Sequence, residues 1–178
     1  GFIARFTKDG DHVRSERFGG KIFDEGAVLT PLSSGDVLVA GMLSGPATIG
    51  GKSVAASDKG SAFLARIGDD DQAAWVGLAG DGYVWTVAAD PDEGMFHVAG
   101  DLGSERWLTE FRADGSQVFA AGRPANDLFF TTSMAVDSGL GVWLSGGFMG
   151  MADFGGGTVL TSSDAGVFLV RLERNGAP

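Results

Sequence analysis

The sequence has no cysteine and only two histidines, one tyrosine and five prolines among 178 residues. Without cysteine there are no disulfides, no thiolate metal sites and no cysteine nucleophile. No apolar run approaches the ~20 residues of a membrane-spanning helix, so we expect no membrane span. Basic residues are also scarce: 13 Lys and Arg stand against 23 Asp and Glu, for a net charge of −10. Such an acidic surface repels phosphate backbones, and we expect no nucleic-acid partner.

Glycine is the residue in excess, with 30 among the 178 residues, against a usual share of about 7%. That much glycine without a collagen triplet indicates many tight turns. Apolar residues alternate with a period of two throughout, and no window keeps a helical period over three turns. The pattern predicts an all-β chain.

Two short apolar segments recur in a fixed order. The first marker starts 61, 44 and 61 residues apart and occurs at Phe2–Phe6, Phe63–Ile67, Trp107–Phe111 and Phe168–Leu172. The second marker ends in glycine and occurs at Val37–Gly41, Phe96–Gly100 and Val142–Gly146. The longer spacings come from two similar 17-residue inserts, Gly45–Ser61 and Gly150–Gly166, which we expect to form a short apolar loop or hairpin. The basic unit is therefore about 44 residues long.

Each unit resolves into four short strands joined by turn residues. In one copy these strands are predicted at Phe63–Ile67, Ala73–Leu78, Val84–Ala88 and Phe96–Ala99. Four strands in about 44 residues is the stride of a β-propeller blade. We therefore predict about three blades' worth of four-stranded antiparallel sheet in one segment, 1–178, starting and ending mid-blade. The divisions are a half blade 1–20, a blade 21–80, a blade 81–122 and a partial blade 123–178. A β-sandwich and a β-solenoid are the alternatives.

Several motifs resemble the bacterial SBBP-type propeller-repeat family, found in secreted and surface repeat proteins of myxobacteria and similar bacteria. These motifs are Phe63–Arg66, Phe18–Gly20, Ala135–Gly139, Val142–Gly146 and the insert Ala152–Gly157. The chain departs from the family at Glu110, where a basic residue is usual, and in the missing insert of its middle repeat. The resemblance implies an extracellular, cell-surface or periplasmic location in a bacterium.

Three blades are too few to close a propeller ring, which usually takes four to eight. Open sheet edges invite pairing with other chains. We therefore expect the ring to be completed by remaining blades of a longer chain or by a homo-oligomer.

Few residues suggest a ligand or metal site. The turn Asp90–Gly94 offers Asp90, Asp92 and Glu93 as a weak calcium site, and an acidic turn is the simpler interpretation. No other cofactor is expected. Trp75, Trp85 and Tyr83 are weak candidates for ligand binding, whereas Trp107 and Trp143 lie in the markers and are predicted to be core residues.

Three basic residues occupy one repeat position: Arg5, Arg66 and Arg171. We expect them to form inter-blade salt bridges or a solvated rim rather than a shared anion site. His97 is interpreted as a packed or partly exposed strand residue, and His12 as a solvated residue after a turn.

No catalytic motif stands out. There is no Gly-x-Ser-x-Gly elbow and no phosphate-binding glycine loop. The expected starts of the inner strands carry residues such as Gly26, Gly82 and Thr132 rather than acids or histidines. This favours a non-catalytic scaffold or binding propeller that presents loops to a protein or glycan partner. A lectin-type propeller and a polysaccharide hydrolase or lyase are the alternatives.

Overall fold

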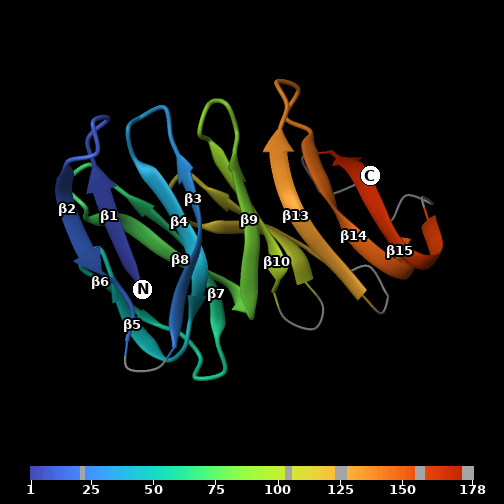
Figure 1. Ribbon diagram of the computed structural model, residues 1–178, viewed down its shortest axis with the longest axis horizontal. Coiled ribbons are helices and arrows are strands. Elements are labelled where there is room, and N and C mark those ends of the chain that lie inside the picture. Colours follow the sequence, from blue (N-terminus) through green and yellow to red (C-terminus); the bar gives the residue numbers. More distant parts are fainter. Residues whose placement is uncertain (21–22, 103–105, 123–127, 155–158, 174–178) are drawn as a thin grey trace.

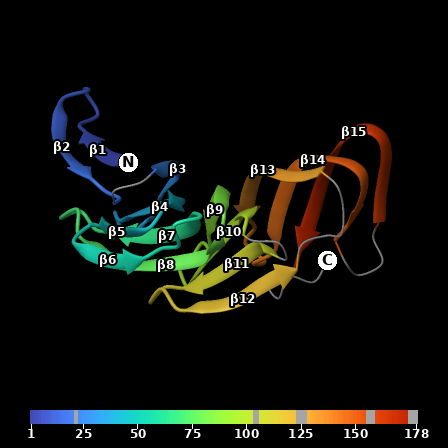
Figure 2. The ribbon, with the colours of Figure 1, turned by 90° about the horizontal axis from the view of Figure 1, so that it is seen from below.

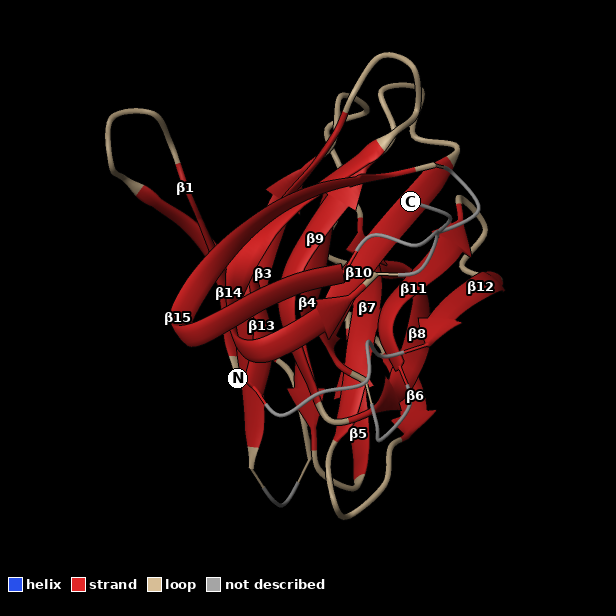
Figure 3. Ribbon diagram, turned by 90° about the vertical axis from the view of Figure 1, so that its right-hand side faces the viewer, coloured by secondary structure: helices blue, strands red, loops and turns tan. Residues whose placement is uncertain are grey.

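The computed structural model describes residues 1–20, 23–102, 106–122, 128–154 and 159–173. All regular elements in these ranges are β-strands, 15 in number, and every pairing between them is antiparallel (Figure 3). The described residues therefore include no helix long and apolar enough to cross a membrane. The predicted all-β class is confirmed.

The strands form a ribbon, a hairpin and three sheets. The ribbon pairs β1 (Phe2–Phe6) with β2 (His12–Arg17), and the hairpin pairs β5 (Pro46–Ile49) with β6 (Lys52–Ala55). Sheet I contains, in order, β3 (Asp24–Pro31), β4 (Val37–Leu43), β7 (Ser61–Ile67) and β8 (Ala73–Asp81). Sheet II contains β9 (Tyr83–Ala89), β10 (Met95–Asp101), β11 (Arg106–Arg112) and β12 (Gln117–Gly122). Sheet III contains β13 (Leu128–Val136), β14 (Val142–Asp153) and β15 (Val159–Leu172).

The ribbon and the three sheets stand side by side in chain order (Figure 1). The first strands of the three sheets, β3, β9 and β13, are neighbours along this row. The row is open, because the ribbon lies at one end and sheet III at the other (Figure 2). The strand expected to start near Thr132 in fact starts four residues earlier, at Leu128.

The glycine that ends the second marker has a steric cause. A Cβ added to Gly41, Gly100 or Gly146 would lie 1.9, 2.1 or 2.0 Å from a carbonyl oxygen of the neighbouring first strand. At this point each first strand carries a β-bulge, which brings its backbone unusually close. Only glycine fits there, so the repeated Gly marks the same bulge in all three sheets.

The two similar inserts fold differently. Gly45–Ser61 contains the separate β5–β6 hairpin, tied to the preceding segment by the Gly19–Thr48 bridge. In the second insert the strands continue, and β14 pairs with β15 out to Asp153 and Val159. The hairpin prediction is confirmed for both, but the second hairpin is an extension of sheet III.

Apolar side chains pack between neighbours in the row. One cluster joins sheets I and II, a second joins sheets II and III, and a third lies among the ribbon, the β5–β6 hairpin and sheet I. The two outermost faces are uncovered: Phe2 and Phe6 are 75% and 58% exposed at one end, and Val167 and Leu169 are 87% and 68% exposed at the other.

Trp143 belongs to the uncovered face of sheet III. Its side chain was predicted to be in the core, and that prediction is wrong, because Trp143 is 37% exposed. No sheet packs on that face among the described residues, and the indole Nε1 donates to Asp137 Oδ2 over 2.9 Å. The same core prediction for Trp107 concerns a side chain that the structure does not describe.

Candidate functional site

The three aromatic candidates have separate surroundings. Trp75 on β8 packs between sheets I and II, stacked on Phe111 with ring centroids 6.2 Å apart, and its Nε1 donates to the Ala113 carbonyl over 2.9 Å. Tyr83 and Trp85 are close together on β9, and both are half-buried. The structure therefore places Trp75 apart from the other two.

Tyr83 links two first strands. Its hydroxyl donates to Glu25 Oε1 on β3 over 3.2 Å. Burial, followed by the charge of Glu25 and this hydrogen bond, raises the pKa of Tyr83 above its ordinary value. The phenol therefore serves as a neutral cross-link between sheets I and II.

The three acidic side chains of the Asp90–Gly94 turn contact different partners and do not meet at one point. Asp90 is buried and contacts His97, whereas Asp92 accepts a hydrogen bond from the backbone N–H of Gly94 within its own turn. Glu93 reaches sheet I, where it accepts from Ser33 Oγ over 2.6 Å and from the Ser34 backbone N–H. The Ser33 bond lowers the pKa of Glu93 more than burial raises it. Among the described residues no group of three His, Asp or Glu side chains is placed to hold a metal ion.

His97 lies buried between two carboxylates. Its Nε2 is 2.8 Å from Asp90 Oδ1 and its Nδ1 is 3.3 Å from Glu110 Oε1, and all three side chains are at most 3% exposed. Burial lowers the pKa of His97, but the interactions of its ring with the Glu110 and Asp90 carboxylates raise it by more, so the net shift is upward. Sequence reasoning identified His97 as a strand residue and Glu110 as unusual, but it missed that the two residues pair.

The repeated basic position forms ion pairs in two of its three copies. Arg66 Nε lies 2.6 Å from Asp36 Oδ2, and its Nη2 reaches Glu93 of sheet II at 3.6 Å. Arg171 Nε lies 2.8 Å from Asp137 Oδ2 on sheet III. The predicted salt bridge between neighbouring repeat units is thus confirmed for Arg66.

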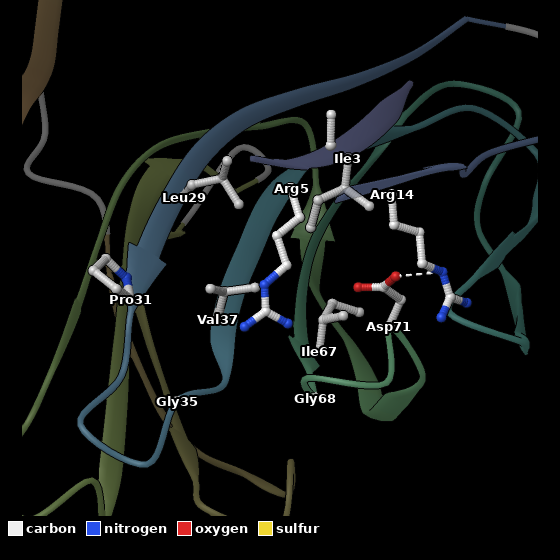
Figure 4. A pocket seen from close by; sticks show the side chains of 11 residues that line it. Ile3, Arg5, Arg14, Leu29, Pro31, Gly35, Val37, Ile67, Gly68 and Asp71 are labelled. Carbon is white, nitrogen blue, oxygen red and sulfur yellow. Dashed lines mark ion pairs between the residues drawn. The ribbon is translucent and has the colours of Figure 1, made fainter. Parts of the chain in front are cut away.

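Arg5 is the exception at this position. Its Nη1 donates to the Asp69 carbonyl over 3.1 Å, and in the described part of the chain no carboxylate lies within ion-pair distance of it. Arg5 and Arg14 instead face a cleft between the ribbon and sheet I (Figure 4). Arg14 Nε binds Asp71 Oδ2 at 2.6 Å across this cleft.

The volume of the cleft is about 300 Å³. Its walls are mostly apolar and come from β1, β3, β4 and β7; they include Ile3, Leu29, Pro31, Val37 and Ile67. Figure 4 shows the Arg5 side chain reaching down beside Val37, with Asp71 and Arg14 paired at the other side. The cavity therefore combines an apolar body with one uncompensated cation.

Equivalent repeat positions explain why this space is hollow. Between sheets I and II, the same positions carry large aromatic side chains: Phe96 corresponds to Val37, Phe111 to Ile67 and Trp75 to Arg14. Trp75 packs on both phenylalanines, at centroid distances of 5.8 and 6.2 Å. The cleft was not predicted, although the aligned markers contain two of these three substitutions, Val37 for Phe96 and Ile67 for Phe111.

A comparison with solved structures supports the fold. The chain resembles a gluconolactonase from Xanthomonas campestris with a TM-score of 0.56 and 16% sequence identity. The match covers 98% of this chain and 52% of the gluconolactonase, so the chain spans about half the length of that protein. The arrangement of sheets is therefore propeller-like. No protein-family model and no curated protein sequence matches the chain.

Proposed function

We propose that this chain is a segment of a non-catalytic β-propeller that acts as a scaffold or binding module for a protein or glycan partner. Sheets I and II are then complete four-stranded blades, and the ribbon and sheet III are parts of two further blades. Two observations support these assignments: the equivalent glycine bulges of the three sheets and the match to half of a longer propeller-like protein.

The proposal rests above all on the uncovered apolar faces at the two ends of the row. Val167 and Leu169 expose most of their side chains on sheet III, as Phe2 does on the ribbon. Adjacent exposed apolar side chains of this size are typical of surfaces that pack against another unit. The proposed partners are remaining blades of a longer chain or further copies of this one.

A scaffold role agrees with the use of the ionisable side chains. One buried cluster contains Asp90, His97 and Glu110. Two further carboxylates, Asp36 and Asp137, each form an ion pair with an arginine. A hydrolase needs carboxylates that face a substrate. The placement of Trp75 against Phe111 likewise favours a packing role over a glycan platform.

Membership of the SBBP-type family and a place outside the bacterial cytoplasm remain part of this proposal. They are supported by the sequence motifs quoted above and by the repeat of about 44 residues. Both are independent of the test described next.

Sedimentation velocity combined with an apolar dye tests the uncovered faces. We expect either oligomers larger than the 18.3 kDa chain or a monomer that binds the dye strongly. Leu169→Lys should weaken association or dye binding, whereas Lys8→Ala, at an exposed turn, should leave both unchanged. A monomer that binds no dye would contradict the proposal.

Two assays separate the scaffold from the alternatives. A glycan array distinguishes the two kinds of partner, because binding of a sugar would indicate a glycan partner or the lectin, whereas binding of none would leave a protein partner. Hydrolysis of gluconolactone or of a polysaccharide by the chain would overturn the non-catalytic assignment.

A further inference from the structure

We propose that the cleft between the β1–β2 ribbon and sheet I binds a small aromatic monocarboxylate. In this arrangement the ligand's carboxylate binds Arg5, and its ring lies over Val37 and Ile67. This site is distinct from the uncovered end faces and does not depend on the scaffold role proposed above.

The dimensions of the cleft suit a small molecule. Its volume of about 300 Å³ lies at the lower end of the range of ligand pockets, ~300–1,000 Å³. Its apolar walls come from β1 of the ribbon on one side and from β3, β4 and β7 of sheet I on the other (Figure 4). Apolar walls with a few placed polar groups are the usual composition of a ligand site.

The contact between sheets I and II indicates the shape of the group that would fill the cleft. Between sheets I and II the equivalent space is filled by the indole of Trp75, which lies at 14° to the ring of Phe111. In the cleft the residue at the Trp75 position is Arg14, whose side chain is half exposed and turned to Asp71. A flat ring supplied by a ligand would restore the packing that the sequence leaves out.

The charges indicate the ligand's polar group. Arg66 and Arg171 each have a carboxylate partner within 2.8 Å, and Arg5, at the same repeat position, has only a backbone carbonyl among the described residues. A carboxylate forms charge-assisted hydrogen bonds with a guanidinium. Because Arg14 is already neutralised by Asp71, the cleft compensates one negative charge rather than two.

Isothermal titration with indole-3-propionate, using the 178-residue chain, tests the site. We expect the acid to bind at least tenfold more tightly than its neutral amide, indole-3-propionamide. Arg5→Met should lower the affinity for the acid at least tenfold and leave that for the amide unchanged. Arg17→Met is the matched control, because Arg17 lies on the same ribbon outside the cleft and its replacement removes the same charge.

A second variant tests the position of the ring. Arg14→Trp places an indole where Trp75 lies in the neighbouring contact, and it should lower the affinity for both acid and amide at least tenfold. Arg14 is half exposed on the two-stranded ribbon, so this variant should fold. Circular dichroism checks that expectation.

Three results would overturn the proposal. They are equal affinities for acid and amide, an equal loss in Arg5→Met and Arg17→Met, or no binding of indole-3-propionate by the unaltered chain. None of these results bears on the uncovered face of sheet III, so the proposed scaffold role would be judged separately.

Discussion

The contact between sheets I and II and the contact between the β1–β2 ribbon and sheet I use equivalent positions of one repeat. In the first contact Trp75, Phe96 and Phe111 fill the space, and Arg66 lies 5.9 Å from the centre of the Phe96 ring. In the second contact Val37 and Ile67 leave a cavity of about 300 Å³. Side-chain volume at a few positions therefore decides whether two sheets are sealed or form a cleft.

Close packing in the filled contact extends to the backbone. A Cβ added to Gly77 would lie 2.7 Å from a ring carbon of Phe111, and one added to Gly115 would lie 2.6 Å from the Trp75 ring. The aromatic rings therefore occupy space that the neighbouring chain leaves free. The cleft has no comparable group in its centre among the described residues.

Truncating one equivalent residue in each contact should give the largest difference in stability between the filled contact and the hollow one. Phe96→Ala removes a fully buried ring and should lower the free energy of unfolding by about 4 kcal/mol. Val37→Ala, at the equivalent position, removes a half-buried side chain and should cost about 1 kcal/mol. Urea denaturation measures both losses of stability, and equal losses would contradict the difference between a filled and a hollow contact.

The contact between sheets II and III should be sensitive to loss of its buried cation. His97→Gln leaves Asp90 and Glu110 buried without a cationic partner and should cost about 3 kcal/mol near pH 6. His12→Gln is the control, because His12 is exposed on the ribbon and should contribute little.

The His97 contribution should depend on pH with a defined sign. The folded pKa of His97 is raised above its unfolded value of about 6.5. Its stabilisation is therefore fully present below about pH 6.5 and is lost as the pH rises through the folded pKa. The stability gap between the native chain and His97→Gln should narrow from pH 6 to pH 9. A gap that widens with pH would contradict a protonated His97.

Filling the cleft should give the smallest effect. Arg14→Trp replaces a half-exposed ion pair by apolar contact and should raise the free energy of unfolding by about 1 kcal/mol. Thermal unfolding detects a gain of this size. A loss of stability would show that the cleft does not accept a ring.

Much of the fold was predictable, because the repeat fixes both strand order and turn positions. The segments predicted at Phe63–Ile67, Ala73–Leu78 and Phe96–Ala99 lie within β7, β8 and β10. The turns are marked by Asp-Gly and Gly-rich segments, and the strands by apolar residues that alternate with a period of two, so both can be found from short stretches of sequence. The different course of the second insert was not predictable, since both inserts contain the same turn residues.

The sites were harder to predict, because they depend on which faces meet. The alignment placed Arg5, Arg66 and Arg171 together, but their different partners come from turns and neighbouring sheets. Trp143 was misassigned because a marker position is buried only when another sheet covers it. The markers already aligned Val37 with Phe96, but Arg14 could be recognised as the equivalent of Trp75 only from the strand registers of the ribbon and sheet I.

Native-state hydrogen exchange measures the difference between the two contacts most directly. We predict that amides of the β1–β2 ribbon, such as that of Ala4, exchange through local opening, while the amide of Val98 in β10 exchanges only on global unfolding. Saturating indole-3-propionate should slow exchange in the ribbon and leave β10 unchanged. Equal protection of Ala4 and Val98 in the free chain would contradict the account, because a hollow contact and a filled one would then hold their strands equally well.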